Sequence, residues 1–126
     1  MTIPDLSDYF KTFKELTAQN GFAMECHTVD TADGYQLDVF RIQPDNTKQF
    51  SRDFIGPQKP VVFMQHGFLA SADCWVVNEH TSAPAFQLAR QGYDVWIGNQ
   101  RGSKYSRKHQ TLDPDVDKKE FWEFSF

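Results

Sequence analysis

The residues of this sequence with the clearest chemical potential are His66, Gly67 and Phe68, which follow the apolar run at 61 to 65. A glycine at the end of a buried strand allows a sharp turn that a side chain would hinder. The next backbone N–H, that of Phe68, then points into the crevice beyond the strand. A fixed donor there stabilises the oxyanion of an acyl-transfer reaction. A tight strand-to-helix turn without a chemical role needs the same residues, so the tripeptide alone leaves both interpretations open.

A covalent acyl transfer also needs a nucleophile, and the expected one does not occur in these 126 residues. A serine nucleophile of this kind stands in the pattern Gly-x-Ser-x-Gly, and none of the seven serines, at 7, 51, 71, 82, 103, 106 and 125, has that context. Residues 98 to 102, GNQRG, have the glycine spacing but carry Gln100 at the centre. If the loop does provide an oxyanion donor, these residues therefore provide it without the nucleophile and base that would use it.

Two other groupings of a nucleophile with a base occur in the chain. Ser71 lies near His66 and Asp73 in the sequence, and Cys74 lies near His80. Proximity in the sequence does not make a triad, because a triad is defined by its geometry. We expect neither grouping to act.

The remaining histidines and the cysteines suggest no metal chemistry. The four histidines show no metal-ligand spacing and no Cys-x-x-Cys pair occurs, so the sequence predicts no metal site and no cofactor. His27 and His109 are expected to be surface or hydrogen-bonded structural residues. Cys26 and Cys74 are expected to be reduced and packed, although a single bridge between them stays open.

The charge of the chain argues against one class of partner. The formal net charge is −4, whereas a nucleic-acid-binding protein is usually basic. The stretch RGSKYSRKH, at 101 to 109, holds four Lys or Arg residues and suits either a phosphate or membrane-surface patch or a solvated loop. We favour the solvated loop because the whole chain is acidic. No apolar run approaches the roughly 18 residues of a membrane helix.

The N-terminal part of the sequence predicts a helix and a hairpin. Leu6, Phe10, Phe13 and Leu16 recur at helical spacing within a helix expected over 4 to 20. Strands are expected over about 23 to 31 and 35 to 43, because Asp33-Gly34 between them is a strong hairpin signal. A polar, turn-rich surface loop follows at 43 to 59.

The middle of the chain predicts a βαβ unit. The continuous apolar run at 61 to 65 is typical of a strand covered on both faces. A helix is expected over about 82 to 91, with Ser82 as its cap, Pro84 in its first turn and Gly92 as its stop. A second buried strand is expected over 93 to 98. This order indicates an α/β class with a mostly parallel sheet, which brings the strand ends to one edge.

The C-terminal stretch EFWEFSF is unusually aromatic, with four rings in its last six residues. Chain ends are ordinarily polar and frayed, whereas each such ring can bury about 150–250 Å². We expect these rings either to fold back onto the sheet or to meet something further, such as a partner.

Four stretches of the sequence resemble the N-terminal region of the acid lipases, which are the gastric and lysosomal lipases and their steryl ester hydrolase relatives. They are ADGYQLDVFRI, KPVVFMQHGFLASADCWVVN, LARQGYDVWIGNQRGSKYSRKH and EFWEFSF, and the resemblance runs from about residue 21 to 126. It implies the N-terminal part of an α/β-hydrolase fold. It also implies an intact parent that cleaves fatty acyl esters in triglycerides or sterol esters, so that its substrate is a neutral lipid.

The family's functional residues transfer to this sequence only in part. The His-Gly-Leu loop of the family falls on His66, Gly67 and Phe68, so the resemblance assigns the Phe68 backbone N–H to the oxyanion hole and loop shape to the other two. Phe stands where the family usually has Leu, a change that a backbone donor survives. We interpret the turn at 98 to 102 and the stretch YSRKH at 105 to 109 as mainly structural.

The family's serine elbow, acid and catalytic histidine lie beyond the segment matched here. We therefore expect residues 1–126 to form a single partial domain, roughly the first third of a lipase, without activity by itself. A non-catalytic lipid-binding or regulatory fragment and a subunit completed by a partner are the alternatives. The family is usually lysosomal or secreted, yet the first residues MTIPDLSDYF have no signal-peptide pattern, so the sequence assigns no compartment.

Overall fold

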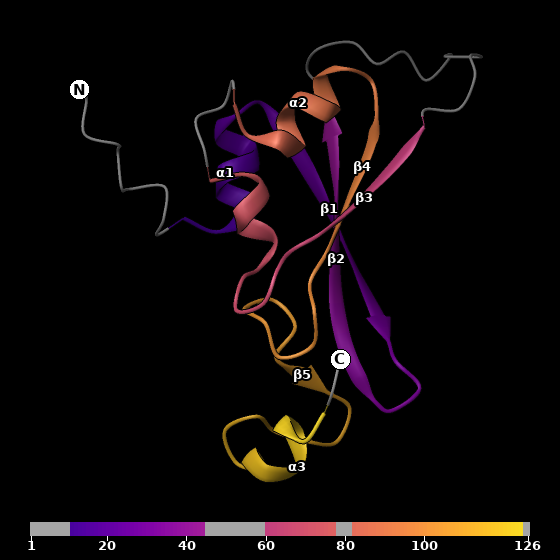
Figure 1. Ribbon diagram of the computed structural model, residues 1–126, viewed down its shortest axis with the longest axis vertical. Coiled ribbons are helices and arrows are strands. Elements are labelled where there is room, and N and C mark those ends of the chain that lie inside the picture. The colour runs from indigo at the N-terminus through magenta and orange to yellow at the C-terminus, as the bar shows by residue number, and fades with distance from the viewer. Residues whose placement is uncertain (1–10, 45–59, 78–81, 125–126) are drawn as a thin grey trace.

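The computed structural model describes residues 11–44, 60–77 and 82–124 of the chain. These residues form a sheet with helices at one end of the molecule and a short helix at the other (Figure 1). In chain order the elements are α1 (Phe13–Gln19), β1 (Phe22–Asp30), β2 (Tyr35–Pro44), β3 (Val61–Gln65), a 3₁₀ turn (Ala72–Trp75), α2 (Pro84–Arg90), β4 (Asp94–Gly98), β5 (Lys108–His109) and α3 (Lys118–Trp122). The predicted helical residues 4–10 and most of the predicted loop at 43–59 lie outside the described residues.

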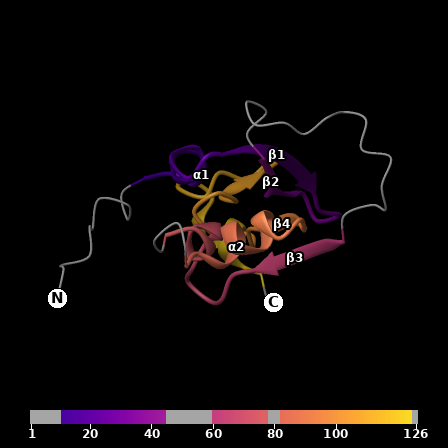
Figure 2. The same cartoon turned by 90° about the horizontal axis from the view of Figure 1, so that it is seen from above.

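The sheet has the strand order β1-β2-β4-β3, and β5 pairs with β2. The β3–β4 pair is parallel, and its connection contains α2, so the predicted βαβ unit is confirmed. The other pairs of the described strands are antiparallel. The sheet is therefore mixed, where we expected a mostly parallel one, because the hairpin strand β2 lies directly beside β4. Figure 2 shows β3 and β1 at opposite edges.

The predicted hairpin is confirmed at Asp33-Gly34. The Thr31 N–H donates to the Tyr35 carbonyl at 2.8 Å, and Gly34 has a φ of 95°, which side chains rarely adopt. A β-carbon at Gly34 would also lie 2.7 Å from the imidazole of His109. The hairpin thus needs glycine for its backbone and for the ring that lies against it.

Helix α1 begins at Phe13, so the described residues 11 and 12, which the prediction placed in the helix, are not helical. Thr12 has extended backbone angles, and its side chain accepts a hydrogen bond from the Glu15 N–H at 3.3 Å. A threonine cap with glutamate three residues later is a known start signal. The apolar spacing of Phe13 and Leu16 is still helical, and both side chains are buried.

Helix α2 begins at Pro84 as expected, but its cap differs from the prediction. Ala83, not Ser82, is the capping residue, and it makes no side-chain hydrogen bond to the first turn. Ala83 is fully buried, and Pro84 at the first helical position has no N–H to satisfy. Burial of a small residue therefore takes the place of a polar cap here.

The core lies on one face of the sheet, where α1 and α2 pack. Apolar side chains from both helices meet one face of β2, β3 and β4; the buried residues of this cluster are Phe13, Leu16, Phe40, Ile42, Met64, Ala72, Val76, Ala83, Ala85, Phe86, Val95 and Ile97. The rings of Phe13 and Phe40 lie 4.6 Å apart between α1 and β2. Burial of these side chains supplies the main stabilising term of the fold.

The opposite face of β3 is open among the described residues. On this face, Val61 and Phe63 are 65% and 60% exposed. Met64, at the alternate position and so on the other face, is buried. The expectation that this strand is covered on both faces is therefore wrong, because both packed helices lie on the Met64 side. A hollow of about 360 Å³ on the open face is lined in part by Leu37 and Gly98.

Three of the four C-terminal rings lie in the described residues and fold back onto the chain. Phe121 is fully buried, with its ring 5.4 Å from that of Tyr35, whose hydroxyl donates to the Phe121 carbonyl. Phe124 lies 5.5 Å from the same tyrosine ring. Phe126 lies outside the described residues. Phe121 and Phe124 therefore pack against Tyr35 of the same chain, whereas Trp122 is 42% exposed.

We expected both cysteines to be packed, but neither is. Cys26 and Cys74 are both free thiols and both exposed. Among the described residues, no group of three or more His, Cys, Asp or Glu side chains is arranged to hold a metal ion. None of the helices in the described ranges is long and apolar enough to cross a membrane.

Candidate functional site

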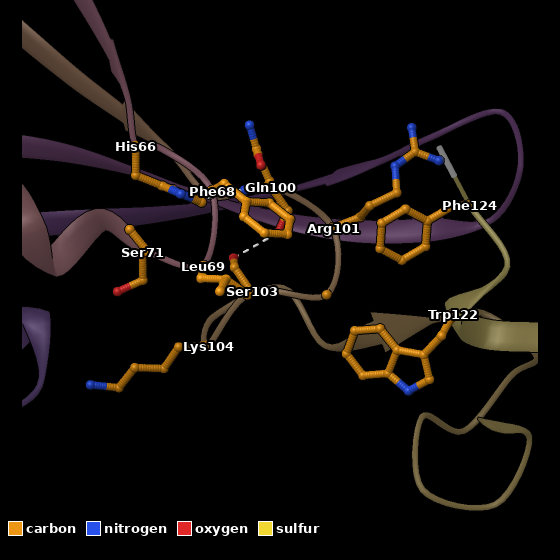
Figure 3. Close-up of a pocket in the computed structure, with 12 residues that line it drawn as sticks. His66, Phe68, Leu69, Ser71, Gln100, Arg101, Ser103, Lys104, Trp122 and Phe124 are labelled. Carbon is orange, nitrogen blue, oxygen red and sulfur yellow. Dashed lines mark hydrogen bonds between the residues drawn. The ribbon is translucent and has the colours of Figure 1, made fainter. Parts of the chain in front are cut away.

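An apolar cavity of about 550 Å³ lies beyond the carboxyl ends of β3 and β4 (Figure 3). The loop after β3 lines it with His66, Phe68, Leu69, Ala70 and Ser71. The loop after β4 contributes residues 100–104, and the C-terminal segment adds Trp122 and Phe124. This is the edge of an α/β sheet at which ligands bind, and the volume is that of a small-molecule site.

His66 joins the two loops that line the cavity. Its ring is buried, and its Nε2 atom accepts a hydrogen bond from the Gln100 N–H at 3.0 Å. The Nδ1 atom lies 2.8 Å from the Gly67 carbonyl oxygen, which can only accept. The two partners assign a neutral ring with its proton on Nδ1. The imidazole thereby fixes the turn after β3 relative to the turn after β4.

The turn after β3 contains a strained residue. The Ala70 N–H donates to the Gly67 carbonyl at 3.2 Å, which closes a four-residue turn. Leu69, its third residue, has a φ of 59° and is the one non-glycine residue with positive φ among those described. That conformation costs an L-residue about 1–2 kcal/mol. Leu69 is also 90% exposed, so burial of its side chain does not offset the cost.

Gly67 is not required by the turn in the way that the sequence suggested. Its φ lies outside the left-handed range, and a β-carbon added there would meet no atom within 4 Å beyond the neighbouring residues. The expectation that a side chain at 67 would hinder the turn is therefore wrong on steric grounds. The glycine leaves open space in front of the loop.

A buried amide supports the floor between the loops. Asn99 accepts a hydrogen bond from the Ala72 N–H at 2.9 Å and donates to the Asp38 carbonyl at 2.8 Å. The hydroxyl of Ser106, also buried, donates to the Asn99 carbonyl at 3.1 Å. These bonds connect β2, the end of β4 and the 3₁₀ turn. The turn at 98 to 102 therefore has the structural contacts that we expected of it.

The basic stretch at 101 to 109 pairs with acidic residues of the same chain. Each of its four Lys or Arg side chains lies within salt-bridge distance of an aspartate. The pairs are Arg101–Asp33 (2.6 Å), Lys104–Asp73 (2.7 Å), Arg107–Asp115 (3.0 Å) and Lys108–Asp38 (2.8 Å). This intramolecular pairing favours a structural role over a phosphate or membrane-surface patch.

Ser71, His66 and Asp73 do not form a triad. Both ring nitrogens of His66 are used by backbone groups, and the Ser71 hydroxyl oxygen accepts from the Asp73 N–H at 3.3 Å. The Asp73 carboxylate accepts from Lys104 and from the Tyr105 hydroxyl, each at 2.7 Å. The hydrogen bond from Lys104 to Asp73 raises the pKa of the Lys104 ammonium, which keeps the lysine charged.

Cys74 has the environment of an unreactive thiol. Partial desolvation, and next the charge of Asp73, raise the pKa of Cys74 above its ordinary value. A nucleophilic cysteine needs a lowered pKa, because the thiolate is the reactive form. Its suggested base, His80, lies outside the described residues.

The aromatic wall of the cavity depends on a close approach at Gly102. This glycine has a φ of 78°, and a β-carbon on it would lie 2.6 Å from the Trp122 ring. Arg101 lies over the rings of Tyr35 and Phe124, at 5.0 and 5.6 Å. The sequence indicated that the C-terminal rings pack somewhere, but not that Trp122 and Phe124 border the same cavity as His66.

Two of these residues carried no sequence signal for their roles. Leucine is disfavoured at a left-handed position, so nothing predicts Leu69 there. Asn99 lies beside the glycine of a turn, where asparagine commonly serves the turn itself. A buried bridging amide becomes visible only when β2 and the 3₁₀ turn are brought beside it.

Comparisons with known proteins place this sequence among lipases. The model of a partial alpha/beta-hydrolase lipase region matches residues 13–79. The chain is 48% identical over 112 residues to human lysosomal acid lipase/cholesteryl ester hydrolase, covering 89% of this chain and 27% of the relative. It is 45% identical over 106 residues to bovine gastric triacylglycerol lipase, covering 84% and 25%.

Human lipase member M is similar over the largest share of this chain among these three. Identity is 40% over 121 residues, which is 93% of this chain and 26% of that relative. The chain thus spans about a quarter of the length of the curated relatives it matches. The matched family region includes β1 to β3 and the His66-Gly67-Phe68 loop. From the family match, the mixed sheet and the relatives together, the chain belongs to the α/β-hydrolase lipase family.

Proposed function

We propose that this chain provides the oxyanion-hole side of a lipid ester hydrolase, with the Phe68 backbone N–H as one of the two donors. The substrate class is a neutral lipid ester, a triglyceride or a steryl ester. The printed names of the relatives, a cholesteryl ester hydrolase and a triacylglycerol lipase, support this class. The residues 1–126 then act as one partial domain that requires the family's nucleophile, acid and base for catalysis.

One observation carries the proposal. The turn that contains Phe68 lies at the mouth of a 550 Å³ apolar cavity at the carboxyl ends of two parallel strands. A long acyl chain needs such an apolar volume, and the developing negative charge of its carbonyl needs a fixed donor beside it. His66 supports the donor by holding the turn against Gln100.

Replacing Phe68 by proline tests the donor directly. Phe68 is the second residue of the turn from Gly67 to Ala70, the position at which proline is favoured, so the turn should survive while the N–H is removed. In an enzyme built by joining this chain to the remainder of a related lysosomal acid lipase, we expect Phe68→Pro to lower kcat about 10²–10³-fold.

The matched control is Phe68→Leu, which removes the ring but keeps the N–H. Its kcat should stay within a few-fold of the parent. Circular dichroism and Tm of all three proteins establish that the folded fraction is equal. A Phe68→Pro enzyme that is folded and turns over at the parent's rate would contradict the assignment of this N–H.

A second substitution examines the space left by Gly67. Because a β-carbon there meets no atom within 4 Å, Gly67→Ala should change Tm by no more than a few degrees. If the reacting carbonyl occupies that space, the same change should lower kcat/KM in the joined enzyme at least tenfold. Measuring Tm and kcat/KM on one preparation separates the two effects. Loss of Tm in step with activity would make the glycine structural.

The cavity favours one alternative function, binding a fatty acyl chain without cleaving it. Trp122 and Phe124 complete the apolar wall of the cavity. This alternative needs no further residues. It predicts saturable binding of a fatty acid to the 126-residue chain, and no gain of hydrolysis on joining the rest of a lipase.

A further inference from the structure

The turn at the cavity mouth presents a large apolar side chain where neither folding nor the proposed oxyanion chemistry needs one. Leu69 is 90% exposed and has the left-handed φ of 59°. Glycine would adopt this backbone without strain. A strained residue persists where the surrounding structure determines it, and such residues gather at ligand sites. Neither folding nor the proposed oxyanion role therefore explains why leucine occupies position 69.

The position of that side chain suggests which ligand it meets. Leu69 lines the cavity together with Phe68, which is itself 76% exposed. Trp122 and Phe124 stand across the same cavity on the C-terminal segment (Figure 3). The loop thus supplies an apolar contact on one side, and the aromatic segment supplies one on the other. A flexible apolar chain that enters between them would cover Leu69 and lose its own contact with water.

We propose that Leu69 is a specificity-determining residue that binds the alkyl chain of the substrate at the cavity mouth, and that its left-handed backbone serves to present it there. The inference rests on the proposed function, because it takes an acyl chain as the occupant of the cavity. It adds a side-chain contact that the oxyanion role of the Phe68 N–H does not require. The ligand is a single alkyl chain rather than a lipid surface.

The charges around the cavity agree with an uncharged alkyl chain at this point. Lys104, a cation of the lining, is paired with Asp73 at 2.7 Å. Arg101 is paired with Asp33 and lies over Tyr35. Both cations of the lining are engaged within the chain, so the contact at Leu69 is left to apolar groups.

Two substitutions at Leu69 separate the side chain from the backbone. Leu69→Ala removes most of the side chain and keeps the strain. Leu69→Gly removes the side chain and the strain together. Titration with a fluorescent palmitate below its critical micelle concentration measures Kd for each 126-residue chain. We expect both variants to weaken binding about 5- to 10-fold, while only Leu69→Gly raises Tm, by about 2–5 °C.

The control is Leu37→Ala, which makes the same chemical change outside this cavity, in the hollow on the open face of the sheet. Its Kd should equal that of the parent. If Leu69→Ala binds palmitate as tightly as the parent, the proposed contact is overturned. If only Leu69→Gly weakens binding, the loop backbone and not the side chain is responsible, which also overturns it.

Two further results separate a failure of the Leu69 contact from a failure of the proposed function. If the parent chain binds no palmitate at all, the cavity does not bind acyl chains, and the proposed function itself is wrong. If the parent binds palmitate and Leu69 affects only its adsorption to phosphatidylcholine vesicles, a surface contact replaces the single-chain contact. Parallel loss of palmitate binding in both Leu69 variants, with the control unchanged, is the result that supports the proposal.

Discussion

The 126-residue chain, purified by itself, is expected to release no fatty acid from p-nitrophenyl esters or from a triglyceride emulsion above the rate in buffer. No serine of the sequence stands in a Gly-x-Ser-x-Gly context. His66, which lines the cavity, uses both ring nitrogens in backbone hydrogen bonds. An oxyanion donor without nucleophile and base leaves no covalent route, so the expected loss relative to an intact lipase is the entire covalent rate enhancement.

The informative comparison is the same chain joined to the remainder of a related lipase, which should regain hydrolysis. A second purification step removes contaminating esterase. The Ser71→Ala variant then shows whether any remaining turnover depends on this serine. Turnover by the isolated chain that survives repurification and disappears in Ser71→Ala would mean that a local nucleophile exists. Binding of palmitate without turnover in both proteins would instead favour the non-catalytic lipid-binding function.

Replacing Asn99 by alanine is expected to have the largest effect on stability of any change in the two loops. The substitution leaves the Ala72 N–H and the Asp38 carbonyl without partners in a buried region. Each of the two orphaned groups costs about 1–3 kcal/mol, so the free energy of unfolding should fall by about 2–6 kcal/mol. Urea denaturation followed by circular dichroism measures the change.

Gln100→Ala serves as the matched control, because it truncates the next amide side chain and leaves the Gln100 N–H to His66 intact. A surface change of this kind alters stability by about 0.5 kcal/mol or less. Equal effects of the two substitutions would show that the Asn99 bridge contributes nothing beyond an ordinary side chain. The structural interpretation of the turn at 98 to 102 would then be wrong.

Local patterns predicted the elements of this fold well where short-range chemistry decides them. The Asp33-Gly34 hairpin and the βαβ unit from β3 to β4 follow from turn residues and apolar runs, and both are confirmed. The start of α1 failed because apolar spacing was preferred to the Thr12 and Glu15 capping pair. That signal was present in the sequence, so this boundary was predictable.

Other features depend on which surfaces meet, which a sequence pattern does not carry. The apolar run of β3 has the same pattern whether one or both faces are covered, and Phe63 is exposed because both packed helices lie on the other face. The cavity likewise combines loops from β3 and β4 with the distant Trp122. The His66-Gly67-Phe68 loop could be identified from the sequence, but the apolar wall on the opposite side of the cavity could not.

The contact between Trp122 and Gly102 has a spectroscopic consequence. With the indole carbons this close to the glycine, the aromatic ring current acts on the Gly102 α-protons and moves their NMR resonances away from the range of ordinary glycines. The shift decays steeply with separation, so it reports whether the C-terminal segment is docked on the loop after β4. Ligands that enter the cavity and displace the segment can therefore be recognised from one pair of proton signals, without any label.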